Sequence, residues 1–358
     1  MIKQTYRLRL ASPAFLGGAD QRGTWRTPPI KALIREWWRL AIAPELGYDY
    51  RQMKQQETWL FGTAADEAGG ENHRSQIRLA LAHWHVGTCT TWPAGERRIQ
   101  HEEVKDRDGK PTQVGSELYL GFGPLQYDKT TRSTKLKNNA ALQENESNVL
   151  RLALPDAELA NLQRALTLAH WFGTVGGRSR NGWGSMLWVA EEGTQPLPAL
   201  SASALHLSGC TRALKQCLEL DWPHAIGSDG AGPLVWRSSE AFRDWHEAMT
   251  FLARTKIAFR THLEFNGGQP HRDVQPRHAL AYPVTNHKVP AWEGNGKGRL
   301  ANTLRFKLDT ETGGHLRAVI YHTPCRPPSN LPHSLDLLDT WQQVHRFLDA
   351  QPTLARLD

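Results

Sequence analysis

The sequence predicts an α+β protein of two domains, the first with the element order β-α-β-β-α-β. Three observations predict this class. The chain has 358 residues, which suits two domains of ordinary size better than one. Alternating polar and apolar residues begin at the N-terminus and recur in short stretches up to residue 190. Two segments with apolar residues at helical spacing separate those stretches.

The first half contains all six predicted elements in order. The first helix follows an N-terminal strand and has clear boundaries: Thr27 is its expected cap, Pro28 and Pro29 fit its first turn, and Pro44 ends it. The strands are predicted at residues 4–10, 75–86, 117–124 and 185–190, and the second helix at 156–172.

A polar, proline-bearing stretch at 191–204 predicts a linker, which divides the chain into domains 1–195 and 196–358. After this linker, the pattern at residues 238–260 predicts a long helix capped by Ser238 or Ser239. The remaining predicted elements are strands at 303–308 and 316–322 and a closing helix at 334–350. These favour a second α+β domain that is a diverged copy of the first.

Composition limits the classes of function. Hydrophobic residues make up 39% of the chain, which is enough for a packed core and argues against global disorder. No run of 18 apolar residues occurs, so we expect no membrane span. The four cysteines form no C-x-x-C pair, which favours reduced thiols in the cytoplasm. The net charge of +7 favours a polyanionic partner.

The segment GTVGGRSRNGWGSM, residues 173–186, is the strongest functional signal. A phosphate-binding P-loop needs a lysine where Trp183 stands, and a dinucleotide loop runs from strand to helix, whereas this segment runs from helix to strand. The composition instead favours a clamp on a nucleic-acid backbone. Its glycine amides and arginines would bind phosphates, and Trp183 would stack on a base. The candidate RNA-binding residues are Gly176, Gly177, Arg178, Ser179, Arg180, Gly182, Trp183 and Gly184. A plain connector with solvated arginines is the alternative.

The first predicted helix has a basic stripe, because Lys31, Arg35 and Arg39 recur at every fourth position. We expect these three side chains to follow a phosphate backbone, with a merely solvated helix face as the alternative. Trp37 lies on the apolar face and is predicted to be core. Trp38 is predicted to stack on RNA or to pack at a subunit interface.

These stretches resemble one known family. The glycine-rich segment is similar to that of the RAMP superfamily, the RNA-binding subunits of CRISPR effector complexes. The combination of FLGGAD, RTPPIKALIREWWRLA, ETWLFGT and SQIRLAL resembles the first RAMP subunit of the type III-B (Cmr) complex, and YLGFGP, RLANTLRFKL and AVIYH fit the same family. Two departures are that Glu36 interrupts the basic stripe and that the second half has no clear glycine-rich loop.

The resemblance implies tandem ferredoxin-like (RRM-like) domains and a role in an antiviral ribonucleoprotein. It implies guide RNA, target RNA and other RAMP subunits as partners, and no catalytic residues in this subunit. His206, Cys210 and Cys217 lie close together, but no second ligand pair has zinc spacing, so we expect no metal site, and we expect no cofactor. Two alternatives stay open. His83, His85 and His101 would serve a metal-independent RNA endonuclease of the same superfamily, and a scaffold would contact only proteins.

Fourteen tryptophans are more than a two-domain core obviously needs. We therefore expect part of the aromatic surface to be covered only in an assembled complex. The expected docking elements are the polar loops at 87–116 and 127–148.

Overall fold

Strand alternation in the N-terminal segment builds the first of two four-stranded sheets. In the computed structural model, which describes residues 1–63, 72–137, 139–293, 298–311 and 313–357, Tyr6, Leu8 and Leu10 are fully buried while Arg7 between them is exposed. The sheet has the order β2-β7-β1-β8, and all neighbours are antiparallel. Its strands are β1 (Ile2–Leu10), β2 (Arg78–Leu81), β7 (Ser147–Leu154) and β8 (Met186–Ala190).

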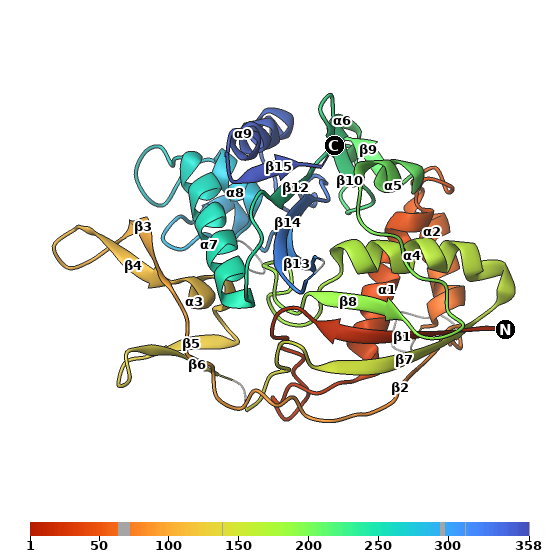
Figure 1. Cartoon of the computed structure of the whole chain (residues 1–358). Coiled ribbons are helices and arrows are strands. Elements are labelled where there is room, and N and C mark those ends of the chain that lie inside the picture. The colour runs from red at the N-terminus through yellow and green to blue at the C-terminus, as the bar shows by residue number, and fades with distance from the viewer. Residues whose placement is uncertain (64–71, 138, 294–297, 312, 358) are drawn as a thin grey trace.

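Two amphipathic helices, α1 (Thr27–Ile42) and α4 (Leu159–Phe172), pack side by side on this sheet (Figure 1). Pro28 and Pro29 lie in the first turn of α1, as predicted. Thr27 is already helical, however, and the cap position belongs to Arg26, whose side chain makes no capping hydrogen bond. The start predicted for the second helix is a 3₁₀ turn, Asp156–Glu158, that leads into α4.

The predicted strand at 117–124 is wrong. Residues Ser116–Gly121 form a short helix, α3. A short apolar run between glycines does not distinguish a buried strand from a buried helix. Tertiary contacts decide in favour of the helix, because the buried carboxylate of Glu117 accepts a hydrogen bond from Trp92 Nε1 (2.7 Å).

The second sheet has the order β13-β14-β12-β15, again with antiparallel neighbours. Strands β13 and β14 and the closing helix lie where the sequence predicts them. The long helix is shorter than predicted: it begins after Asp244, whose side chain accepts a hydrogen bond from Glu247 N (2.8 Å), while Ser238 lies in a strand. The elements are β12 (Val235–Ser238), α7 (Trp245–His262), β13 (Leu304–Thr310), β14 (Leu316–His322), α9 (Leu337–Asp349) and β15 (Leu354–Arg356).

The polar loops predicted at 87–116 and 127–148 contain two antiparallel hairpins, which project from the same side of the molecule in Figure 1; position 138 lies outside the described residues. The hairpin strands are β3 (Arg98–Lys105), β4 (Pro111–Gly115), β5 (Leu125–Asp128) and β6 (Ser133–Leu136). The other elements are α2 (Tyr50–Phe61), α5 (Ala202–Leu207), β9 (Thr211–Ala213), α6 (Leu214–Cys217), β10 (Ile226–Asp229), β11 (Gly232–Pro233), α8 (Pro276–Leu280) and a 3₁₀ turn at Pro290–Trp292.

The hydrophobic core continues across the two halves. Tyr321 of β14 packs in the cluster built around α1 and α4. Phe15 and Trp183 from the first half pack in the cluster around α7 and the second sheet. The protein is therefore of the mixed α+β class, as predicted, and its two four-stranded sheets are antiparallel. The boundary at residue 195 stays a prediction.

The tryptophans are mainly core residues, so their number does not require a partner to cover them, and the expected covering of aromatic surface in a complex stays a prediction. Only Trp59 and Trp84 are exposed, and Trp222 is half-buried, whereas the other 11 of the 14 are buried. The shared core explains the number, because it needs more large side chains than two separate small cores. Among the described residues, no helix is long and apolar enough to span a membrane.

Candidate nucleic-acid interface

The glycine-rich segment lies where the two halves meet. It leads from α4 to β8 and covers β13, an edge strand of the second sheet. Phe306 N donates to Arg180 O (3.1 Å), and Leu308 N donates to Ser185 Oγ (2.8 Å). The segment therefore pairs with backbone groups that an edge strand would otherwise leave open.

Close backbone approach requires glycine at two positions. Gly184 has φ +65°, and a Cβ there would lie 2.0 Å from Val175 O. Gly176 has φ +90°, and a Cβ there would lie 2.7 Å from Phe15 O. No larger residue fits without moving the backbone.

Most of the glycine amides are already used inside the protein. Gly177 N donates to Phe15 O (2.9 Å), Gly182 N to Ser179 O (3.0 Å) and Gly184 N to Pro13 O (2.9 Å). The prediction that these three amides bind phosphate is therefore wrong. They hold the loop in place instead, because a buried amide needs an acceptor.

The tip of the segment, residues 178–180, is free to bind an anion. Arg178 has φ +57°, and the backbone amides of Arg178, Ser179 and Arg180 have no acceptor among the described residues. Both arginine side chains are exposed, and neither has an ion-pair or hydrogen-bond partner within the described part of the chain. Consecutive free amides beside a left-handed residue, flanked by two guanidinium groups, are suited to phosphate binding.

This tip opens into a cleft of about 690 Å³ between the two halves. Five cationic side chains and one acidic side chain line it: Arg178, Arg180, Lys256, Arg299, Arg305 and Glu36. Among the described residues, the walls come from α1, the turn after α3, the second half of α7, β13, and residues between 281 and 285 and at 299–302. A pocket with this balance of charge favours a polyanion.

Glu36, the acidic residue of the cleft, forms its ion pair with a residue outside its own helix α1. Glu36 Oε1 accepts a hydrogen bond from Arg305 Nη1 of β13 (2.5 Å). Burial raises the pKa of Glu36, but the charge and hydrogen bond of Arg305, with Arg180 and Arg39, bring it below its usual value. Arg305 is thus neutralised, which leaves Arg178, Arg180 and Arg299 as the exposed cations of the cleft.

Lys256 of α7 lies against the glycine-rich segment. Its Nζ donates to Asn181 Oδ1 (2.7 Å), and Asn181 Nδ2 donates to Leu120 O of α3 (2.7 Å). Burial lowers the pKa of Lys256 to about 7, and the charges of Arg260 and Arg178 act in the same direction. The charge of this corner of the cleft therefore changes near neutral pH.

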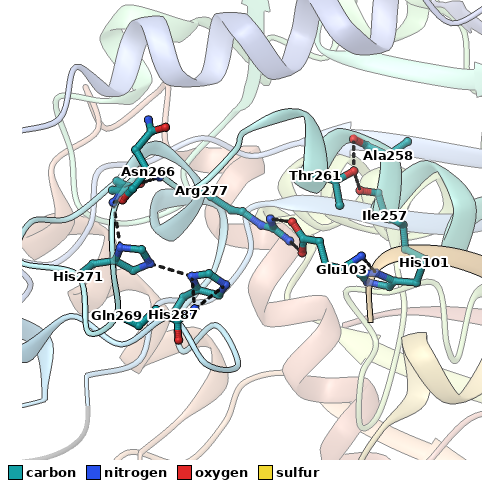
Figure 2. A network of polar contacts seen from close by, with 11 residues as sticks. His101, Glu103, Ile257, Ala258, Thr261, Asn266, Gln269, His271, Arg277 and His287 are labelled. Carbon is teal, nitrogen blue, oxygen red and sulfur yellow. Dashed lines mark hydrogen bonds and ion pairs between the residues drawn. The ribbon is translucent and has the colours of Figure 1, made fainter. Parts of the chain in front are cut away.

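Figure 2 shows a network of polar contacts that contains several histidines. The network adjoins the wall of the cleft formed by Tyr282, because the ring of His278 makes an edge contact with the ring of Tyr282. His271 Nε2 and His287 Nδ1 are 2.7 Å apart, and the two rings are stacked. Arg277 makes a two-pronged ion pair with Glu103 of β3, which ties this wall to the first hairpin. Burial lowers the pKa of the adjacent His278 to about 4, so that ring is neutral at physiological pH.

The basic stripe of α1 makes internal contacts rather than facing the cleft. Arg39 forms a two-pronged ion pair with Glu57 of α2, and Arg35 Nε lies 3.9 Å from the same carboxylate. Lys31 Nζ donates to Phe61 O (2.7 Å). The structure does not bring the stripe together with Arg178 and Arg180, because Lys31 and Arg35 line a different groove.

Both predicted stacking tryptophans are buried, so those two predictions are wrong. Trp38 is 1% exposed and packs on Phe61. Trp183 is fully buried among Phe15, Trp92 and Trp245, with ring centroids 5.2, 5.5 and 5.7 Å away. The sequence could not show this, because glycines on both sides of Trp183 allow its ring to point either way. Trp37 is core, as predicted.

The histidines of the endonuclease alternative lie outside the cleft. His83 and His85 are exposed beyond the end of β2, and His101 is buried beside Tyr119. None of the three lines the cleft. The described residues contain no group of three or more His, Cys, Asp or Glu side chains that could hold a metal, and all four cysteines are unpaired.

Three residues of the cleft escaped the sequence analysis: Phe122, Lys256 and Arg299. Phe122 lies within the segment 117–124 that was mistaken for a strand. Lys256 lies within a predicted helix that shows no basic stripe. The only signal for Arg299 was its position at the start of the family-like stretch RLANTLRFKL.

Comparison with solved structures finds related folds at low sequence identity. Apo Cmr1 from Pyrococcus furiosus is 15% identical with a TM-score of 0.51, and the match covers 100% of this chain and 99% of that chain. A chain of type III-B Cmr-beta bound to cognate target RNA is 11% identical with a TM-score of 0.49, covering 97% and 99%. A chain of a type IV-B CRISPR complex is 12% identical with a TM-score of 0.31, covering 56% and 94%.

At these identities the likeness to Cmr1 is one of fold. No curated protein is significantly similar in sequence. The sequence pattern of the RAMP superfamily, in contrast, matches residues 7–187, which is half of the chain and includes the whole glycine-rich segment. The chain therefore belongs to the RAMP superfamily.

Proposed function

We propose that this protein is a noncatalytic RNA-binding subunit of a type III-B CRISPR effector ribonucleoprotein in the cytoplasm. It contacts the guide RNA or the captured target RNA and packs against other RAMP subunits. The observation that carries the proposal is the pair of exposed, unpartnered arginines, Arg178 and Arg180, beside three free backbone amides in a basic cleft. The family membership and the Cmr1-like fold support the same assignment.

The proposal includes two ferredoxin-like units in tandem. The first is β1-α1-β2-β7-α4-β8 and the second is β12-α7-β13-β14-α9-β15. In both, the third strand in chain order lies between the first and the second, and the fourth lies on the other side of the first. That arrangement is the one expected of a split β-α-β fold. The small sheet and the hairpins are then insertions.

A binding role fits the cleft better than a cleavage role. General acid–base cleavage of RNA needs a titratable side chain near the scissile phosphate. The residues that line the cleft include no histidine, and their single carboxylate is held by Arg305. Lys256 is the one lining group with a pKa near neutrality, and it donates to Asn181.

The test measures binding of fluorescent single-stranded guide and target RNAs, with and without a chelator, and follows the integrity of the RNA on a gel. The variant is Arg178→Ala/Arg180→Ala. The matched control is Arg78→Ala/Arg151→Ala, which removes from the open face of the first sheet two exposed arginines whose side chains have no partner among the described residues. We expect intact RNA, a loss of affinity only in the loop variant, and unchanged unfolding temperatures.

Each contrary result has a distinct meaning. Chelator-resistant cleavage that survives in a highly purified sample would replace the binding role by an endonuclease. Equal affinity of wild type and loop variant would remove the cleft from the proposal. Loss of affinity in the control variant alone would move the site to the open face of the sheet, and no binding of either RNA would leave a protein scaffold.

A further inference from the structure

We propose that Phe122 is the stacking platform for one base of single-stranded RNA, with the phosphate of the same nucleotide held by Arg178. This inference rests on the proposed function and specifies what the cleft recognises. It assigns to Phe122 the aromatic role that the buried Trp183 does not fill. The class of ligand follows: a strand with an unpaired base rather than a continuous duplex.

The first argument is the unusual exposure of the ring. Phe122 is 65% exposed, although the other nine residues of the surrounding stretch 116–125 are buried or half-buried. An exposed apolar side chain is not by itself a site. Phe122, however, lines the charged cleft, whereas the comparably exposed ring of Trp84 (62%) does not.

The local backbone holds Phe122 outward. Helix α3 ends at this residue, whose φ of −53° and ψ of 127° turn the chain away from the helix. Gly123 follows with φ +118°, and its amide donates to Leu125 O (3.1 Å). Leu125 turns inward and is fully buried. The turn is thus anchored on both sides of the ring. Little conformational entropy is therefore lost in fixing the ring when RNA binds.

The second argument is the position of Arg178. A Cβ built on Gly123 would lie 3.4 Å from one terminal nitrogen of the Arg178 guanidinium. The guanidinium therefore lies over the bare backbone directly after Phe122, and it has no partner among the described residues. The two loops also touch at Gly177, where a Cβ would lie 3.3 Å from Pro124 Cγ. A nucleotide needs an anion-binding group and an apolar face side by side, and this turn offers both.

The third argument is the attachment of α3 to the glycine-rich segment. Asn181 Nδ2 donates to Leu120 O (2.7 Å), and Gly121 packs over the Trp183 indole, where a Cβ would lie 3.3 Å from Nε1. The platform and the phosphate-binding tip therefore move as one unit. Because stacking needs only an aromatic face, any base fits, and purines with their larger rings are favoured over pyrimidines.

The test uses short single-stranded oligo(A) and oligo(U) RNAs and a blunt RNA duplex, measured by fluorescence anisotropy with the full-length protein. A second probe is oligo(A) with 2-aminopurine at each position in turn, because stacking on an aromatic ring quenches its fluorescence. The variants are Phe122→Ala, Phe122→Leu and Phe122→Trp, with Trp84→Ala as the matched control for loss of an exposed aromatic ring.

We expect Phe122→Ala and Phe122→Leu to weaken oligo(A) binding by roughly 5- to 100-fold and to abolish the quenching at one position. Phe122→Trp should restore both, the control should change neither, and duplex affinity should stay low throughout. Unchanged affinity and quenching in Phe122→Ala, while Arg178→Ala/Arg180→Ala still loses binding, would overturn the stacking role and leave the proposed function intact. If Phe122→Ala and Arg178→Ala/Arg180→Ala both keep their oligo(A) affinity, both the stacking role and the proposed function of the cleft would be overturned.

Discussion

Breaking the ion pair between Glu36 and Arg305 should lower stability and raise RNA affinity at the same time. Arg305 lies on β13 with 7% of its side chain exposed, and Glu36 is the only acidic side chain that lines the cleft among the described residues. Glu36→Gln would leave a buried guanidinium without its counter-charge. Removing one partner of a buried pair typically costs about 3–5 kcal/mol. The Glu36 side chain is 39% exposed, so water can partly replace it, and we expect a loss near the lower end, about 3 kcal/mol.

The pH dependence of that loss has a defined sign. The pKa of Glu36 is lowered in the folded protein, so its ionisation stabilises the fold above its ordinary pKa of 4.5, and this contribution disappears as the pH falls. Wild type and Glu36→Gln should therefore differ most near neutral pH and converge in acid. Because the change also removes a negative charge from the cleft, RNA should bind several-fold more tightly at low salt.

The assay is urea unfolding followed by tryptophan fluorescence, with RNA affinity measured on the same samples. Glu45→Gln is the matched control, because Glu45 pairs with Arg164 at the surface with 52% of its side chain exposed. An exposed pair contributes about 0–1 kcal/mol. Equal stability losses in the two variants would refute the view that Arg305 depends on Glu36, and an unchanged or weaker RNA affinity in Glu36→Gln would refute the electrostatic account of the cleft.

Three further predictions test the core, the cleft and the buried histidines. Trp183→Ala should cost about 3–5 kcal/mol of unfolding free energy, because the ring is fully buried; a change below about 1 kcal/mol would contradict its role as core. RNA affinity should fall as the pH rises through about 7, where Lys256 loses its proton, and Lys256→Met should remove this dependence in a binding titration at several pH values. Burial lowers the pKa of His278 to about 4 and of His345 to about 3, so unfolded chains bind more protons below pH 6.5. Stability should therefore fall by about 2 kcal/mol for each ring between pH 8 and pH 5, and urea unfolding that is flat over this range would refute the prediction.

Elements with long, regular patterns were predictable from the sequence. The alternation of β1 and the apolar stretch of β14 give strands close to the predicted bounds, and Pro28 and Pro29 lie in the first turn of α1 as predicted, although the helix begins one residue earlier than the predicted cap implies. The glycine-rich segment was predicted to contact a polyanion, which stays a prediction, but its site at the edge of the second sheet was not foreseen. Residues 117–124 were misassigned, because a short apolar run does not distinguish a strand from a helix and only the contact of Glu117 with Trp92 decides it.

The sequence also could not predict in which direction the basic side chains point or which of them are paired. Lys31, Arg35 and Arg39 have the spacing of a nucleic-acid-binding stripe, yet Glu57 on the next helix, α2, forms ion pairs with Arg35 and Arg39. Arg178 and Arg180 have no such partner among the described residues. Nothing local in the sequence distinguishes a paired arginine from a free one, because the partner comes from an element that only the fold brings near.

The same reasoning explains why the candidate site belongs to the whole chain rather than to the glycine-rich segment. The tip of that segment comes from the first half, whereas Lys256 and Arg299 come from the second. Arg180 O accepts from the edge strand β13, and Trp183 packs into the core around α7. A segment bound in this way is ordered before RNA arrives, so little of the binding free energy is lost to folding the loop. The glycines therefore let the loop enter a crowded backbone junction, from which Arg178 and Arg180 extend into the cleft.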